Sequence, residues 1–126
     1  MEASPTTQRH ILIIEDEKPM AMALQLKFRK IGYVAEVAFD GEAALVLLKT
    51  QKFDVVLTDL MMPKVDGFAV LQALKEQGNP VPVLVLSNLS QAEDERRARD
   101  LGARDFFVKS NTTIAAIVEA VQNFLH

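Results

Sequence analysis

Four apolar runs in this chain each end at polar or charged residues, and this arrangement constrains the fold more than any other feature of the sequence. Such runs are typical of buried strands in a parallel sheet, and the carboxyl ends of those strands meet at one edge. The runs span residues 11–14, 55–57, 83–86 and 106–108, and they are followed by Glu15 and Asp16, by Thr58 and Asp59, by Ser87, and by Lys109. We therefore expect three carboxylates, a hydroxyl and a lysine in one cleft.

Strand and helix signals alternate five times along the chain, which is typical of an α/β fold. The expected strands cover residues 11–14, 33–38, 53–58, 81–86 and 105–108, and a helix follows each of them. Ser90 is the expected N-cap of the fourth helix, and the fifth helix is expected to begin near Thr112. Because crossovers between parallel strands are right-handed, these units form a five-stranded doubly wound parallel sheet with five helices. The expected strand order, 2-1-3-4-5, makes the first and third strands neighbours.

Length and composition leave room for one domain. The chain has 126 residues, 49% of them hydrophobic, which is enough for a single core. A net charge of −3 gives no broad attraction to nucleic acid or to an anionic membrane, and no apolar stretch is long enough to cross a bilayer. The absence of cysteine excludes a disulfide scaffold and a thiolate metal site. We expect a cytoplasmic protein with a flexible tail over residues 1–9 and one domain over residues 10–126.

Taken singly, each polar residue of the expected cleft has an ordinary structural explanation. Glu15 and Asp16 follow a strand and can cap a helix, Ser87 can bond to its own backbone, and Lys109 can point into water. Their coincidence favours function, because clustered carboxylates repel one another unless a cation lies among them. Carboxylate and carbonyl oxygens are the ligands that Mg²⁺ prefers, while a lysine and a hydroxyl bind anions. The pattern therefore indicates a site for a divalent cation and an anion.

The sequence around these residues extends the pattern beyond single positions. Glu15-Asp16 is accompanied by VVLTDLMMPKVDG at residues 55–67, by Leu86-Ser87, by LGARD at residues 101–105 and by FVK at residues 107–109. Together these stretches resemble the receiver domain of bacterial two-component response regulators, and the resemblance covers nearly the whole chain. It implies a flavodoxin-like fold, on which the expected strand order partly rests. It also implies a phosphoacceptor signalling domain that promotes its own phosphorylation and dephosphorylation, and not a conventional enzyme.

The resemblance implies a role for each residue of the cleft. Asp59 would accept a phosphoryl group from a phosphohistidine, and Ser87 and Lys109 would contact that group. The implied ligands of Mg²⁺ or Mn²⁺ are Glu15 acting through water, Asp16, Asp59 and the backbone carbonyl of Met61. A loose transition state for phosphoryl transfer needs an in-line nucleophile and positive charge on the equatorial oxygens. Asp59 is therefore expected to be ionised.

Two positions near the end of the last strand depart from the family. Ser87 and Phe106 are the implied switch residues, but many members have tyrosine at the position of Phe106. Because phenylalanine has no hydroxyl, switching here would rest on burial alone, and simple packing of an edge-strand aromatic is an equal alternative. The family usually has proline after the lysine, whereas this chain has Ser110, for which a cis bond costs about 3 kcal/mol or more. We expect residues 110–112 to be trans, more mobile, or held by local side-chain bonds.

Surface residues indicate a partner. The first helix shows Met22 and Leu26 away from its apolar stripe, and the polar face of the last helix carries small, weakly charged residues. The apolar stripe of that last helix, which is expected to pack on the sheet, comprises Ile114, Ile117, Val118, Val121, Phe124 and Leu125. The resemblance implies docking of a sensor histidine kinase or a histidine phosphotransfer protein on the first helix. We expect a monomer or weak dimer without direct binding to nucleic acid or membrane, acting either alone or as part of a larger regulator.

The sequence disfavours three other classes of protein. A Mg²⁺-dependent phosphohydrolase with an aspartate nucleophile requires a second aspartate two residues on, where this chain has Met61. A flavodoxin-type electron carrier requires a phosphate-binding loop after the first strand, where Glu15, Asp16 and Glu17 would repel a phosphate. A non-phosphorylated receiver-like interaction module is the alternative closest to the expected function. Retention of all five site residues argues against it.

Overall fold

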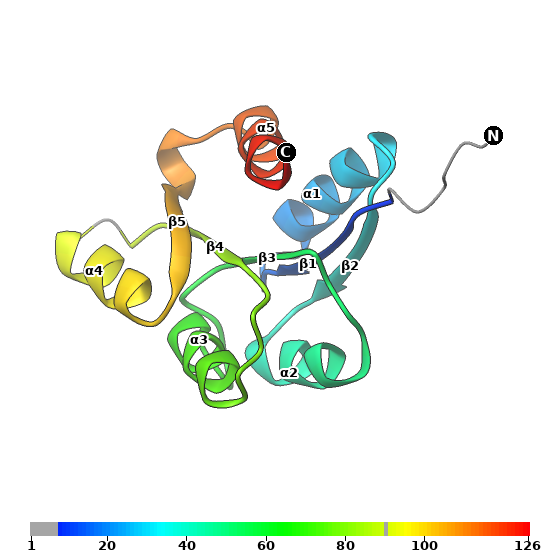
Figure 1. The fold of residues 1–126 in the computed structure, drawn as a ribbon. Coiled ribbons are helices and arrows are strands. Elements are labelled where there is room, and N and C mark those ends of the chain that lie inside the picture. Colours follow the sequence, from blue (N-terminus) through cyan, green and yellow to red (C-terminus); the bar gives the residue numbers. More distant parts are fainter. Residues whose placement is uncertain (1–7, 90) are drawn as a thin grey trace.

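A computed structural model describes residues 8–89 and 91–126. Its elements are β1 (His10–Ile14), α1 (Lys18–Lys30), β2 (Val34–Ala38), α2 (Gly41–Thr50), β3 (Val55–Thr58), α3 (Gly67–Glu76), β4 (Val83–Ser87), α4 (Ala92–Asp100), β5 (Ala103–Val108), the 3-10 turn η2 (Lys109–Asn111) and α5 (Ile114–Leu125). The strands form one parallel sheet in the order β2-β1-β3-β4-β5 (Figure 1). This confirms the predicted doubly wound topology.

Alternating side chains of β1 divide the core into two halves. Ile11 and Ile13 belong to a cluster with α1 and α5, whereas Leu12 and Ile14 belong to a cluster with α2, α3 and α4. Figure 1 shows the same division, with α1 and α5 on one face of the sheet and the other helices on the opposite face. Because helices cover both faces, every one of these four side chains is buried, which explains the uninterrupted apolar run in the sequence.

The strand register brings the polar strand ends together. Ile14 of β1 lies opposite Thr58 of β3, and the next residue, Asp59, donates its N–H to the Ile14 carbonyl at 3.0 Å. On the other side of β3, Ser87 at the end of β4 lies opposite Val108 of β5. Since all of the strands run in one direction, the residues that follow them emerge at the same edge of the sheet.

Side-chain caps fix where three of the helices begin. Asp40 accepts the N–H of Ala43 at the start of α2, and Asp66 accepts the N–H of Ala69 at the start of α3, both at 2.8 Å. Thr113 accepts the N–H of Ala116, and α5 begins at Ile114, two residues after the predicted start near Thr112. Ser90, the predicted cap of α4, lies outside the described residues. These caps satisfy orphan N–H groups of each first turn and hold the preceding loops in place.

The structure answers two expectations about the C-terminal third of the chain. The peptide bond between Lys109 and Ser110 is trans, and the turn is held locally by the Thr112 hydroxyl, which donates to the Val108 carbonyl at 2.9 Å. The assignment of Phe124 to the core was wrong, because its ring is 37% exposed. The guanidinium of Arg104 on edge strand β5 lies 5.7 Å from the ring centroid, so the ring faces a cation and not the sheet.

The N-terminal tail enters the structure only in part. Residues 1–7 lie outside the described residues. Arg9, also placed in the predicted tail, accepts the N–H of Val34 on its carbonyl and donates from its guanidinium to the Leu125 carbonyl at 3.2 Å. Within the described part of the chain, no helix has the length and apolarity needed to cross a membrane.

Candidate functional site

Three carboxylates gather at the carboxyl edge of β1 and β3. One oxygen from each of Glu15, Asp16 and Asp59 lies within 4.8 Å of the others. Glu15 and Asp59 are buried, with 2% and 6% of their surfaces exposed, whereas Asp16 is accessible to solvent. The sequence predicted this grouping from the neighbouring positions of the first and third strands, and the structure places all three residues together.

Lys109 reaches into the same cluster from the end of β5. Its Nζ lies 2.7 Å from Oδ2 of Asp59, 2.8 Å from Oε1 of Glu15 and 3.0 Å from Oε1 of Glu17. The lysine side chain is only 7% exposed, and burial by itself lowers its pKa. The three carboxylate contacts outweigh burial and raise the pKa of Lys109 above its ordinary value, so the ammonium group is charged at neutral pH.

The Asp59 carboxylate is held on both of its oxygens. Oδ1 accepts the N–H of Leu60 at 2.6 Å and the N–H of Met61 at 3.3 Å, while Oδ2 faces the lysine. The loop that supplies these N–H groups is fixed by Gly67, whose own N–H donates to the Leu60 carbonyl at 3.0 Å. A Cβ at Gly67 would overlap the carbonyl oxygen of Asp59, which explains the glycine at this position.

Glu15 is the most buried acid of the group. Burial raises its pKa, and this is opposed by hydrogen bonds from Lys109 and from the backbone N–H of Glu17, which lies 3.0 Å from Oε2. Among the described residues, the cluster contains one lysine, Lys109, and four carboxylates. These carboxylates belong to Glu15, Asp16, Glu17 and Asp59. Since one ammonium group cannot neutralise four acids, the excess of negative charge and the all-oxygen donor set fit a divalent cation such as Mg²⁺.

A pocket of about 270 Å³ opens beside these acids. Its lining includes Ser87 and Lys109 as well as Asp59, so it brings the predicted hydroxyl, cation and nucleophile together. Met61 and Leu89, whose side chains are apolar, also line it. A larger hollow of about 680 Å³ lies at the opposite edge of the sheet, beyond the amino ends of β3 and β4, and its lining has no comparable cluster of acids.

The two predicted switch residues lie on adjacent strands. Ser87 is fully buried, and its Oγ accepts the N–H of Leu89 at 3.2 Å. Phe106 lies opposite Val85 of β4 and is partly buried against the cluster of α2, α3 and α4. In this state the aromatic side chain packs on the core, as a plain packing role requires, and its role as a switch stays a prediction.

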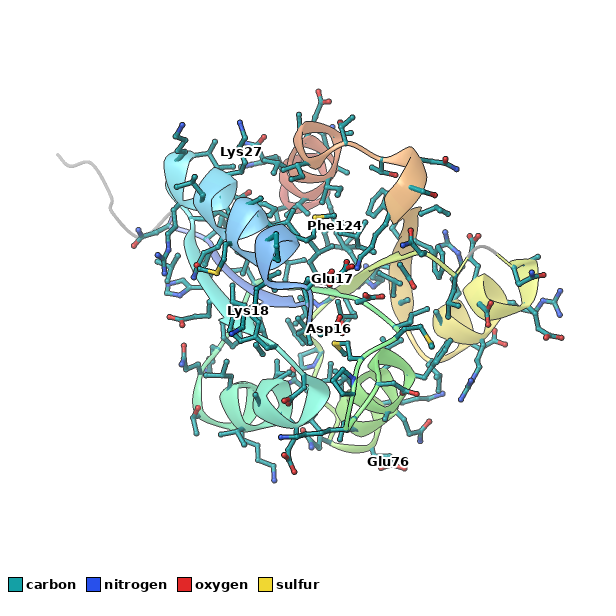
Figure 2. The ribbon with its side chains drawn as sticks, turned by 180° about the vertical axis from the view of Figure 1, so that it is seen from behind. Asp16, Glu17, Lys18, Lys27, Glu76 and Phe124 are labelled. Carbon is teal, nitrogen blue, oxygen red and sulfur yellow. The ribbon has the colours of Figure 1, made fainter. Side chains whose placement is uncertain are left out.

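Glu17 is the site residue whose contact the sequence did not predict. In the sequence, the third acid in the row Glu15-Asp16-Glu17 indicates only a charge that repels phosphate. In the structure Glu17 is the N-cap position of α1 and pairs with Lys109, which lies 92 residues away in the sequence. Figure 2 shows Asp16 and Glu17 side by side in the loop that leads into α1. A run of three acids was the available signal. The pairing of Glu17 with Lys109 depends on the strand order between β1 and β5 and on the reach of the lysine side chain.

Comparison with known proteins agrees with this site. The profile of the response regulator receiver domain matches residues 11–122. The chain is 39% identical over 99 residues to the transcriptional regulatory protein DltR of Streptococcus agalactiae, which covers 79% of this chain and 44% of the relative. It is 34% identical over 115 residues to the alkaline phosphatase synthesis transcriptional regulatory protein PhoP of Bacillus subtilis, which covers 90% of this chain and 48% of the relative. The chain therefore spans less than half the length of these two regulators.

A solved structure gives the same result. The receiver domain of the Francisella response regulator 1452 superposes with a TM-score of 0.87 at 34% identity, over 94% of this chain and 96% of that one. The fold, the acidic cluster and these matches together define the class of protein. The chain belongs to the receiver domain family of two-component response regulators.

Proposed function

We propose that Asp59 accepts a phosphoryl group from a phosphohistidine and that the domain, spanning residues 10–126, relays this event as a conformational signal. The observation that carries the proposal is the fixed carboxylate of Asp59, which faces the pocket beside Glu15 and Asp16 and lies 2.7 Å from the Lys109 ammonium group. A buried nucleophile held by backbone N–H groups is positioned for in-line attack without further ordering.

In the transfer step, an Asp59 oxygen forms a bond to phosphorus while the bond from phosphorus to the histidine nitrogen breaks. The imidazole leaves with its electron pair and takes a proton from solvent. Lys109 balances negative charge on the equatorial oxygens, and the Ser87 hydroxyl donates a hydrogen bond to one of them. The Lys109 ammonium group lies 2.7 Å from the Asp59 carboxylate and offsets part of the negative charge of the neighbouring acids.

The residues proposed to hold a divalent cation, Mg²⁺ or Mn²⁺, are Asp16, Asp59 and the Met61 carbonyl, with Glu15 acting through water. When bound, the cation would supply positive charge that stabilises the phosphoryl oxygens in the transition state. The four-to-one excess of carboxylates over lysine in the cluster supports this assignment. No other cofactor is proposed.

The signal is proposed to pass through Ser87 and Phe106. A phosphoryl group on Asp59 offers the Ser87 hydroxyl a new acceptor in place of its present contact with the Leu89 N–H, and movement of Ser87 would open space toward Phe106 on the neighbouring strand. Since Phe106 has no hydroxyl, the change in its burial would be the whole of its contribution.

The proposed donor is a sensor histidine kinase or a histidine phosphotransfer protein in the cytoplasm, docked on α1. Met22 and Leu26 support this surface, because they are 50% and 59% exposed and lie on the helix that begins beside the pocket. The two relatives compared above, DltR and PhoP, are transcriptional regulatory proteins. For this chain the downstream target is left open, and no direct contact with nucleic acid is proposed.

Intact-protein mass spectrometry tests the phosphoacceptor role. The protein is incubated with acetyl phosphate with and without Mg²⁺, as wild type and as Asp59→Asn, which keeps the shape of the side chain and removes its charge. We expect a phosphoryl adduct that requires both Mg²⁺ and Asp59. An adduct that persists in the variant would assign the phosphate to another residue, and no adduct with any phosphodonor would favour the non-phosphorylated interaction module.

A further inference from the structure

The ammonium group of Lys109 faces three carboxylates in this structure and donates hydrogen bonds to two of them, Asp59 and Glu17. A lysine has three N–H donors. Carboxylate oxygens of Asp59, Glu15 and Glu17 lie 2.7, 2.8 and 3.0 Å from its Nζ. A phosphoryl oxygen that is to contact Lys109 therefore competes with these carboxylates for the ammonium group.

The three carboxylates differ in how firmly they are held. Asp59 is fixed by the Leu60 N–H, and Glu15 is 2% exposed and accepts the Glu17 N–H on its second oxygen. Separation of Glu15 from the lysine would leave a buried carboxylate without its cation, which is costly, while Asp59 is itself the residue that receives the phosphoryl group. The Glu17 side chain is 63% exposed, and within the described residues its carboxylate contacts Lys109 alone. It can turn into water at little cost.

We propose that Glu17 is a positioning residue that occupies the phosphoryl-binding position on Lys109 until a phosphoryl oxygen displaces it. The inference rests on the function proposed for Asp59. Because Glu17 and the phosphoryl group compete for the same N–H, the carboxylate slows phosphorylation by holding the lysine in its resting contact. The location agrees with this role, since Glu17 lies with Asp16 at the start of α1 and both line the pocket (Figure 2).

Simple repulsion is the rival explanation for any effect of Glu17. A carboxylate near the pocket also repels an anionic donor through space, and this repulsion grows with the charge of the donor. Competition for Lys109 does not depend on the donor charge, because the group transferred to Asp59 is the same from every donor. It does depend on the lysine, which simple repulsion does not require.

The experiment measures phosphorylation rates by intact mass with two donors. Acetyl phosphate is a dianion, and phosphoramidate carries less negative charge at neutral pH. The proteins are wild type, Glu17→Gln and the matched control Glu42→Gln, since Glu42 is 68% exposed and also pairs with a lysine, Lys64. We expect Glu17→Gln to react about two- to fivefold faster than wild type with both donors, in line with loss of an exposed ion pair. Glu42→Gln is expected to react at the wild-type rate.

A second comparison adds Lys109→Gln to both wild type and Glu17→Gln. The gain from Glu17→Gln is expected to vanish in this background, because no ammonium group is left to compete for. Unchanged or slower phosphorylation of Glu17→Gln would overturn the inference while leaving Asp59 as the acceptor. A gain that persists without Lys109, that appears only with acetyl phosphate, or that Glu42→Gln shares would overturn it in favour of repulsion. A wild type without any adduct would refute the phosphoacceptor role and the inference together.

Discussion

Lys109 Nζ and Asp59 Oδ2 lie 2.7 Å apart, although 50 residues separate them in the sequence. The contact joins the end of β5 to the end of β3 across β4, which lies between them in the sheet. It therefore exists only when three strands are in register. The contact between Lys109 and Asp59 therefore depends on correct formation of this edge of the sheet.

Lys109→Ala should weaken phosphoryl transfer strongly. The variant removes the cation proposed to face the equatorial oxygens, and loss of one such group typically costs about a hundredfold in rate. The measurement is the time course of the mass adduct with phosphoramidate, and Lys52→Ala is the control because Lys52 is an exposed lysine that does not line the pocket. Wild-type rates in Lys109→Ala would remove the lysine from the mechanism.

Mg²⁺ should stabilise the folded protein. A cation that binds the acidic cluster only in the folded state raises the free energy of unfolding by about 2.7 kcal/mol at a free concentration one hundred times its Kd. Asp16→Asn should abolish most of this gain, because it removes one of the clustered carboxylates. Without Mg²⁺ the same variant should be slightly more stable than wild type, since it relieves repulsion. Urea unfolding with and without Mg²⁺ measures both effects, and an equal gain in the two proteins would exclude Asp16 as a ligand.

Tyr33 should make stability fall in alkaline solution. Its hydroxyl is buried without a hydrogen-bond partner among the described residues. Burial raises the pKa of Tyr33 most, Arg9 lowers it by less, and Asp54 raises it slightly further. The folded state therefore holds the phenolic proton more tightly than the unfolded state. The resulting stability is fully present below the unfolded pKa of 10.0 and is lost as pH rises through the higher folded value.

The sole tyrosine of the chain allows a direct check of that prediction. Absorbance titration of the folded protein should give a phenolic pKa above that of the urea-unfolded protein. Tyr33→Phe keeps the ring that lies 5.4 Å from Phe28, and it should be within about 1 kcal/mol of wild type at neutral pH or more stable, because an unpartnered hydroxyl is removed. Equal pKa values in the folded and unfolded states would contradict the prediction.

Met61 should prolong the phosphorylated state. Its side chain is 61% exposed beside Asp59, and neither it nor Leu89 can orient an attacking water. Met61→Asn places an amide there and should speed loss of the phosphoryl group several-fold. The decay of the mass adduct after donor removal gives the rate, with Met22→Asn as the control at an exposed methionine outside the pocket lining. Decay in Met61→Asn no faster than in wild type would dismiss the idea.

The sequence predicted the elements with the clearest local signals. The apolar runs of β1, β3 and β4 could be predicted because burial on both faces leaves them almost without polar residues. Asp59 and Lys109 could be predicted as neighbours because each follows an apolar run at the same edge, although the run before Lys109 lies on edge strand β5 and is only partly buried. The sheet topology thus followed from local pattern together with handedness and family resemblance.

What could not be predicted depends on side-chain reach and on contacts between elements. The pairing of Glu17 with Lys109 requires the distance between two loops, which no local pattern contains. Phe124 has the helical spacing of a core residue, but it is exposed beside Arg104 of the edge strand, and only the packed structure shows this. The reason for Gly67 is also tertiary, since its Cβ would meet the carbonyl of Asp59.

The loop between β3 and α3 is braced from two directions. Gly67 leaves no space against the Asp59 carbonyl, and at the far side of the loop Gly41 donates its N–H to the Val65 carbonyl, with equally little room for a Cβ. The loop on this side of the pocket is therefore closely packed at both ends. If a phosphoryl group is added to Asp59, its own loop has little room to retreat, and we expect the displacement to be taken up on the opposite side of the pocket, where Ser87 and Lys109 lie. The close packing at these two glycines would thus direct the movement that follows phosphorylation toward Ser87 and Lys109.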